Sequence, residues 1–411
     1  MTEKISSAKA IELENQFGAH NYKPLPVVLS RGKGARVWDA EGKEYFDFLS
    51  AYSAVNQGHC HPDIIKAMSD QIQVLTLTSR AFYNDALGVF EKYMTSTFGF
   101  DKVLPMNTGA EGVETALKLC RKWAYMKKGI AENQAKIIVC ENNFHGRTIT
   151  IVSISTDLSA RKDFGPYTPG FITIPYNDID ALKEALQEPD VAGFLLEPIQ
   201  GEAGVYVPDE GYLQQAAALC KAHNVLFIAD EIQTGIARTG KMIACEHEDV
   251  RPDILILGKA LSGGVYPVSA VLADDNIMMC IKPGEHGSTF GGNPVAARVA
   301  IAALEVVKKE NLAERAETLG EIFRQEMNQL ANECDLISNV RGKGLLNAVV
   351  INDSPDSATA WNLCIDMAKA GVLAKPTHGN IIRFAPPLII SETDLREALN
   401  RIKTVFKEYK A

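Results

Sequence analysis

The chain has 411 residues, of which 46% are hydrophobic and 23% are charged, and this composition is typical of globular proteins and excludes a disordered or fibrous chain. The formal net charge is -9, so the surface repels nucleic acids and anionic membranes unless a local basic patch forms, and no long run of like charges supplies one. We therefore expect small soluble partners, and a length that favours one large domain and a smaller one.

The N-terminal stretch, residues 1–22, is polar and acidic, unlike a signal or transit peptide, and no apolar run reaches the roughly 18 residues that span a bilayer. The 8 cysteines form no CxxC pair, which favours reduced thiols and a cytoplasmic location. Next along the chain, residues 58–62 contain His59, Cys60 and His61 between a glycine and a proline. Adjacent ligands in such a turn do not converge on one ion, so we expect no metal site.

Short strands joined by glycine turns are predicted within residues 31–42, which contain the tetrapeptide Arg31-Gly32-Lys33-Gly34. The same tetrapeptide recurs at residues 341–344, before an apolar run at 345–351. The sequences around the two copies differ, so they predict two similar turns and no duplicated module.

From about residue 100 the pattern alternates between short apolar strands and helices, which predicts an α/β fold with a mostly parallel sheet covered on both faces. The predicted helices include 110–128, 178–186 and 211–223. The predicted strands are 102–106, 136–140, 171–174, 191–196, 225–229 and 254–257.

A helix from Asn293 towards Lys309 is expected to lead into a smaller α+β domain with strands at 346–351 and 381–384 and helices at 358–369 and 392–407. We expect the N-terminal segment 1–50 to pack with this small domain, 311–411, while 51–310 forms the large domain.

Ligands of such sheets bind beyond the carboxyl ends of the strands, where two charged residues stand out. Asp230 follows the apolar strand at 225–229, although a strand end followed by acids also fits a solvated turn. Lys259 follows the strand at 254–257 beside small residues, and partial desolvation there would lower the pKa of its amine towards the nucleophilic range.

Two further segments carry groups that could take part in binding a ligand at the same edge of the sheet. Gly109 and Ala110 begin a helix after a strand, an arrangement that suits an anion, and Phe144, His145 and Arg147 lie together on one loop. A pyridoxal cofactor needs an amine for a Schiff base, an acid beside its ring nitrogen, a phosphate cradle and a group to stack on its ring. The four segments could supply all of these from one edge of the sheet.

The segments 229–235 and 257–259 resemble the signature of class III aminotransferases, which are fold-type I pyridoxal-phosphate enzymes. The resemblance extends over nearly the whole chain and is closer to the ornithine aminotransferases. It is carried by residues 21–27, 53–62, 196–204, 284–294 and 375–387.

The resemblance implies that Lys259 is the Schiff-base lysine and shuttles a proton, and that Asp230 partners the ring nitrogen of pyridoxal 5'-phosphate. It also implies that Gln233 donates to the ring's phenolic oxygen, that Phe144 stacks on the ring, and that Gly109 and Ala110 hold the phosphate. Thr289 resembles the residue that reaches the neighbouring subunit's phosphate, which implies a homodimer with shared active sites.

The implied reaction moves the terminal amine of L-ornithine to 2-oxoglutarate, giving glutamate 5-semialdehyde and L-glutamate. Glutamate brings a carboxylate next to its reacting amine and ornithine does not, so one buried arginine would suit only glutamate. By resemblance, Glu202 neutralises Arg383 when ornithine binds. Tyr22 and Arg147 resemble residues at the distal end, and Tyr52 resembles one associated with ornithine preference, although an aromatic packed in the core also fits its position.

Other hypotheses about the function stay open from the sequence. The chain could be another ω-aminotransferase, acting on N-acetylornithine or 4-aminobutyrate, or a mutase that moves an amine within one molecule. A hypothesis of a different kind is a non-catalytic protein with the same fold that binds pyridoxal phosphate. His145 stands where some relatives carry tryptophan, and we attach no function to it from the sequence.

Overall fold

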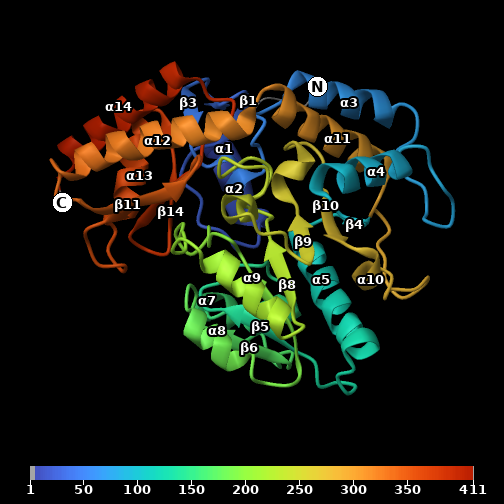
Figure 1. Ribbon diagram of the computed structural model, residues 1–411. Coiled ribbons are helices and arrows are strands. Elements are labelled where there is room, and N and C mark those ends of the chain that lie inside the picture. Colours follow the sequence, from blue (N-terminus) through green and yellow to red (C-terminus); the bar gives the residue numbers. More distant parts are fainter. Residues whose placement is uncertain (1–4, 411) are drawn as a thin grey trace.

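The computed structural model describes residues 5–410, which fold around a central seven-stranded sheet (Figure 1). All neighbouring strands are parallel except at β10, which is antiparallel to both of its neighbours, β4 and β9. In sheet order the strands are β4 (Lys102–Met106), β10 (Ser269–Ala273), β9 (Ile254–Leu257), β8 (Leu226–Asp230), β7 (Val191–Leu196), β5 (Lys136–Cys140) and β6 (Phe171–Ile174).

Both faces of this sheet are buried, because alternate residues of each strand enter two different cores. On one face Ile228 and Ile256 pack in the same cluster as residues of α5 (Gly109–Trp123). On the other face Phe227 and Leu257 join a larger cluster that includes α9 (Tyr212–Ala222) and α11 (Pro294–Lys309). Strands buried on both sides need continuous apolar runs, as the sequence has there.

The smaller part of the molecule is built from both ends of the chain, as predicted. The N-terminal strands β1 (Leu29–Lys33), β2 (Arg36–Asp39) and β3 (Glu44–Asp47) form a sheet with β13 (Val372–Leu373), whose Val372 lies opposite Phe46. A second sheet has the order β11 (Ile337–Lys343), β12 (Leu346–Ile351), β15 (Ile381–Phe384) and β14 (Lys375–Thr377). Figure 1 places α12 (Leu312–Ala331), α13 (Thr359–Lys369) and α14 (Glu392–Glu408) together on this side of the molecule.

The repeated tetrapeptide lies at two hairpin turns. Its first copy ends β1 and turns into β2 at Gly34, and its second ends β11 and turns into β12 at Gly344, where φ is 62° and 54° respectively. Glycine adopts this left-handed conformation without a steric penalty, so the repeat reflects two similar turns.

The remaining helices surround these sheets. They are α1 (Ser7–Phe17), α3 (Pro62–Ile72), α4 (Leu87–Phe98), η1 (Ala124–Lys128), α6 (Ile149–Ile154), α7 (Leu158–Arg161), α8 (Ile179–Ala185), η2 (Ala244–Glu248), η3 (Lys259–Ser262) and α10 (Asp275–Met278). Within residues 5–410 no helix combines the length and the apolar character that crossing a bilayer requires.

The histidines of residues 58–62 bond to separate carboxylates. His59 contacts Asp47 at 2.7 Å, and His61 contacts Glu310 at 2.9 Å. Residues 58–62 thus include two histidines held in place by different parts of the fold.

Candidate active site

The carboxyl ends of β8 and β9 bring two ionisable groups to one cavity. These strands are parallel neighbours, with Asp230 opposite Ile256, so Asp230 and Lys259 emerge at the same edge of the sheet. The cavity is lined by Gly109, Ala110, Phe144, His145, Gly146, Glu197, Glu202, Asp230, Ile232, Gln233, Thr234 and Lys259. Sequence segments that lie up to 150 residues apart therefore meet there, as predicted.

Lys259 enters the cavity on a constrained backbone. It has a φ of 41°, which is uncommon for a non-glycine residue, and it follows Gly258 directly after the buried β9. Burial lowers the pKa of the Lys259 amine and nearby Arg383 lowers it further, while the carboxylates of Glu202 and Asp230 act in the opposite direction. A lowered pKa gives this amine more of its neutral, nucleophilic form at neutral pH.

Asp230 is almost fully buried and is held on two sides. One carboxylate oxygen accepts the backbone N–H of Ile232 at 3.1 Å, and the other lies 2.6 Å from Nδ1 of the buried His145. Burial acts to lower the pKa of His145, but the hydrogen bond and charge of Asp230 outweigh it and raise that pKa. The raised pKa favours the imidazolium form of His145, whose Nδ1–H donates to the Asp230 carboxylate.

Glu197 is a second buried carboxyl group next to this pair. It follows β7 and accepts the backbone N–H of Phe144 at 2.9 Å. Burial raises the pKa of Glu197 to about 7, with Asp230 adding repulsion and His145 opposing the shift. The cavity wall therefore holds a proton that titrates near neutrality.

The start of α5 offers unpaired backbone donors to the cavity. Thr108 and Glu111 form a capping box, in which the Thr108 hydroxyl accepts the N–H of Glu111. The N–H groups of Gly109 and Ala110, in the first turn, have no partner within the helix. Together with the helix dipole they suit a phosphate.

The residues present fit a pyridoxal phosphate group. Besides the amine, the buried carboxylate and the helix N-terminus, the cavity contains the Phe144 ring. Among the residues that line this cavity, His145 Nε2 and Gln233 Oε1 are buried polar atoms without a hydrogen-bond partner in residues 5–410. The Gln233 amide donates one N–H to Glu202 at 2.9 Å, which leaves its second N–H for another acceptor.

An ion pair between a buried arginine and a partly buried glutamate lies beside the lysine. Arg383, on β15, is 3% exposed and donates to Glu202 at 2.8 Å and to the backbone carbonyl of Gly201 at 3.2 Å. Burial acts against ionisation of Glu202, but the charges of Arg383 and Lys259 and the hydrogen bonds from Gln233 and Arg383 lower its pKa to about 2. The carboxylate therefore stays charged and neutralises the guanidinium.

Tyr52 faces this pair from an unusual turn. All four residues of α2 (Ser50–Ser53) have φ between 46° and 71°, so α2 is a left-handed turn. The Asp47 carboxylate holds its start by accepting the N–H groups of Leu49 and Ser50. This turn puts the Tyr52 ring 5.4 Å from the Arg383 guanidinium carbon.

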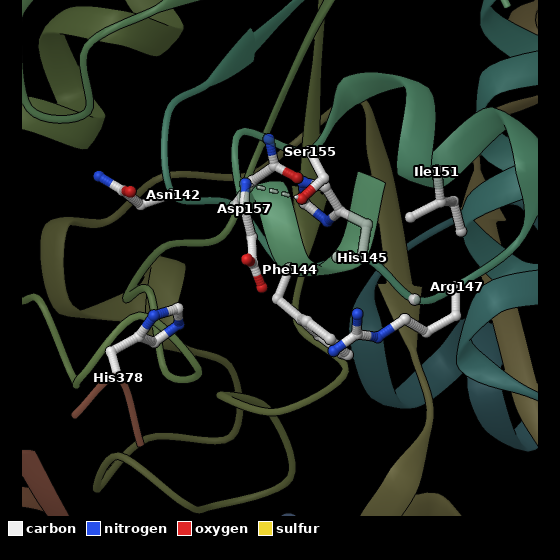
Figure 2. Close-up of a pocket in the computed structure, with 11 residues that line it drawn as sticks. Asn142, Phe144, His145, Arg147, Ile151, Ser155, Asp157 and His378 are labelled. Atoms are coloured by element: carbon white, nitrogen blue, oxygen red, sulfur yellow. Dashed lines mark hydrogen bonds between the residues drawn. The ribbon is translucent and has the colours of Figure 1, made fainter. Parts of the chain in front are cut away.

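The cleft widens outwards from the lysine. Besides Lys259, Glu202, Arg383 and Tyr52, its lining includes Tyr22, Leu49, Phe144, Arg147, Asp157, Lys375, Pro376, Thr377 and His378. The guanidinium of Arg147 reaches over the Phe144 ring at 5.4 Å from its centre, and Figure 2 shows Asp157 and His378 on the other side of that ring. Tyr22 is 69% exposed at the cleft entrance.

Thr289 is the one predicted site residue that lies outside this cleft. It is exposed, in the loop between α10 and α11, and lines neither the lysine cavity nor the outer cleft. Three further residues here, for which the sequence predicted no role, are His145, Glu197 and Asp157. Their residue types alone did not indicate a place in the site, because only the fold brings the segments of residues 145, 197 and 230 together.

A lysine, a buried carboxylate and a helix N-terminus at the edge of such a sheet define a pyridoxal-phosphate-dependent enzyme of fold type I. The family model of class-III aminotransferases matches residues 17–406. The chain belongs to the class-III aminotransferases, and pyridoxal phosphate is its cofactor.

Within this family, ornithine aminotransferases are similar to this chain over nearly its whole length. The mitochondrial ornithine aminotransferase of Drosophila ananassae is 62% identical over 95% of this chain and 89% of its own. The ornithine aminotransferase structure from Toxoplasma gondii is 50% identical, with a TM-score of 0.96 over 98% of this chain and 95% of that one. A structure described as acetylornithine aminotransferase, from Elizabethkingia anophelis, is 64% identical, with a TM-score of 0.91 over 98% of this chain and 100% of that one.

Proposed function

We propose that the protein is an ornithine aminotransferase, which moves the δ-amino group of L-ornithine to 2-oxoglutarate and yields glutamate 5-semialdehyde and L-glutamate. The observation that carries this proposal is the ion pair between Glu202 and Arg383 in the same cleft as Lys259. A cleft that can offer either a neutralised or a free arginine accommodates both an amine without and an amine with an adjacent carboxylate.

Each group at the inner end of the cleft would have its own task in this reaction. Lys259 would hold the aldehyde carbon of the cofactor and later carry a proton to and from the substrate carbon, which its lowered pKa favours. Asp230, supported by His145, would keep a ring nitrogen protonated. Gly109 and Ala110 would bind the phosphate, and Phe144 would stack on the ring. When bound, the cofactor supplies a sink for the negative charge that develops on the amine-bearing carbon.

The two substrates would use the ion pair differently. With ornithine, Glu202 stays on Arg383, so no unpaired buried cation faces the aliphatic chain. With glutamate, the α-carboxylate takes the place of Glu202 on Arg383. Tyr22 and Arg147 would bind the far carboxylate of either substrate, and Tyr52 would limit the space beside Arg383.

We also propose a homodimer with shared sites. Thr289 is exposed outside its own cleft, beside Phe290 at 47% exposure, and the segment 74–83 exposes Val74 at 80% and Phe82 at 72%. Apolar side chains gathered in exposed segments mark a surface for another subunit. The domain limits 1–50, 51–310 and 311–411 and the cytoplasmic location stay predictions. From the resemblance we also predict a role in proline synthesis or arginine breakdown.

A second candidate function is the transfer of the same amine from N-acetylornithine. It is favoured by the 64% identity to the structure described as acetylornithine aminotransferase. The reacting end of this substrate is identical to that of ornithine, so the Glu202–Arg383 pair does not separate the two. Only the distal end of the cleft can discriminate between them.

The absorbance of the purified holoenzyme tests the proposal. L-ornithine should convert the cofactor spectrum to that of the amino form, and 2-oxoglutarate should restore it, with one glutamate formed per cycle. A protein whose spectrum responds to N-acetylornithine and not to ornithine would have the second function, and one that responds to neither would be a binding protein.

A further inference from the structure

The distal end of ornithine carries two charges, and the groups discussed so far account for one. Arg147 can pair with the α-carboxylate, but the α-ammonium beside it also loses water when it enters the cleft. Burying an ammonium without an acceptor is costly. This argument rests on the proposed function, because N-acetylornithine has an uncharged amide at the same place.

Within the described part of the chain, two of the residues that line the cleft carry carboxylates, Glu202 and Asp157. Glu202 is at the inner end, where one of its oxygens already accepts from both Arg383 and Gln233. Asp157 lies at the outer end, and Figure 2 shows its carboxylate directed into the space between His378 and Arg147, beside the Phe144 ring. Asp157 therefore lies at the correct end of the cleft for an α-ammonium.

Asp157 has a free acceptor and a fixed orientation. One oxygen, Oδ1, accepts the N–H of Ser159 at 2.8 Å and its hydroxyl at 2.7 Å, while Oδ2 has no partner within residues 5–410. Partial burial acts to raise the pKa of Asp157, but these hydrogen bonds and the charges of His378 and Arg147 lower it, so the group is ionised. Arg147 acts on Asp157 through its charge and forms no hydrogen bond with it within the same residues, so Asp157 Oδ2 stays available to a ligand.

We propose that Asp157 binds the α-ammonium of ornithine through Oδ2 and so selects the free amino acid over its N-acetyl derivative. Arg147 and Asp157 would together recognise the zwitterionic end of the substrate. Glutamate places only a carboxylate at this end, so Asp157 gives it no attraction.

The test is Asp157→Asn in the holoenzyme. Asparagine keeps an oxygen that can accept from Ser159, so α7 keeps its N-terminal cap, while the negative charge is lost. Half-reaction rates are measured for L-ornithine, N-acetylornithine and 5-aminovalerate, which has the δ-amine and the carboxylate but no α-ammonium. We expect kcat/KM for ornithine to fall roughly 10- to 100-fold, mainly through KM, as for loss of a charged hydrogen bond. The other two substrates should change less than about threefold.

The matched control is Asp163→Asn, which removes one negative charge from an exposed position nearby that lines neither cavity. It should leave all three rates unchanged. An equal loss for all three substrates in Asp157→Asn, or an unchanged preference for ornithine, would overturn this inference while the proposed function stands. A wild-type enzyme that accepts N-acetylornithine and 5-aminovalerate but not ornithine would overturn the proposed function itself.

Discussion

Removing Glu202 should change which amine the enzyme prefers. In the wild-type protein Glu202 neutralises Arg383, which is only 3% exposed. The pKa of Glu202 falls from 4.5 to about 2, and at about 1.4 kcal/mol per pKa unit this corresponds to about 3 kcal/mol of preference for the charged form. Glu202→Ala leaves the guanidinium unpaired when ornithine binds, but available to the α-carboxylate of glutamate.

The expected result is a shift in selectivity. Removing one partner of a buried ion pair costs about 3 kcal/mol or more, which corresponds to roughly a 100-fold change in the ratio of kcat/KM for ornithine to kcat/KM for glutamate. The ornithine value should fall, and the glutamate value should stay constant or rise, because no carboxylate then competes for Arg383. Stopped-flow absorbance of the two half-reactions, each started with one amino donor, measures both values separately.

The control is Glu210→Ala, which removes an exposed carboxylate of the same chain region and should alter neither rate. Melting temperatures of both variants show whether the fold is intact. Equal loss with ornithine and glutamate, in a folded Glu202→Ala protein, would refute the reasoning, since it would mean that Glu202 supports the site as a whole and does not control the charge of Arg383.

Three more changes have defined outcomes. Lys259→Ala should abolish turnover while circular dichroism and the melting temperature show a retained fold, and measurable turnover would contradict its role. Because burial raises the pKa of Glu197 from 4.5 to about 7, the folded protein holds a proton between these values that the unfolded chain releases, so stability falls as pH rises through this window. Glu197→Gln should remove this fall, which is about 3 kcal/mol at most, and melting at pH 5 and pH 8 measures it. Ala51→Gly relieves a φ of 46° at an exposed position; it should stabilise the protein by about 0.5–1 kcal/mol, and a lower melting temperature would disprove the strain.

The predicted strands of the large domain agree with the structure to within one residue, because strands covered on both faces need unbroken apolar runs such as Ile254–Leu257. The antiparallel strand β10 was not predicted. Its sequence, Ser269–Ala273, consists of small and apolar residues without a periodic signal, and its direction depends on pairing with β4 and β9. The left-handed turn at Ser50–Ser53 was also missed, since none of these residues is a glycine.

Much of the chemistry follows from the sequence alone. Lys259 and Asp230 each end an apolar strand, and parallel neighbours necessarily expose such ends at one edge of a sheet. Together with the helix start at Gly109 and Ala110 and the loop that carries Phe144, this local pattern predicted the cofactor and the position of the site. The same logic applies to Gly109 and Ala110, since a helix that begins after a strand presents free N–H groups whatever surrounds it.

Only the tertiary structure decided how these groups influence one another. The bond of His145 to Asp230 joins residues 85 positions apart, the pair of Arg383 and Glu202 spans 181, and Asp157 meets His378 across one cleft. Charge and pKa depend on distance and on burial, and both are properties of the folded surroundings. The residue types come from the sequence, but their protonation states arise only when distant segments exclude water together.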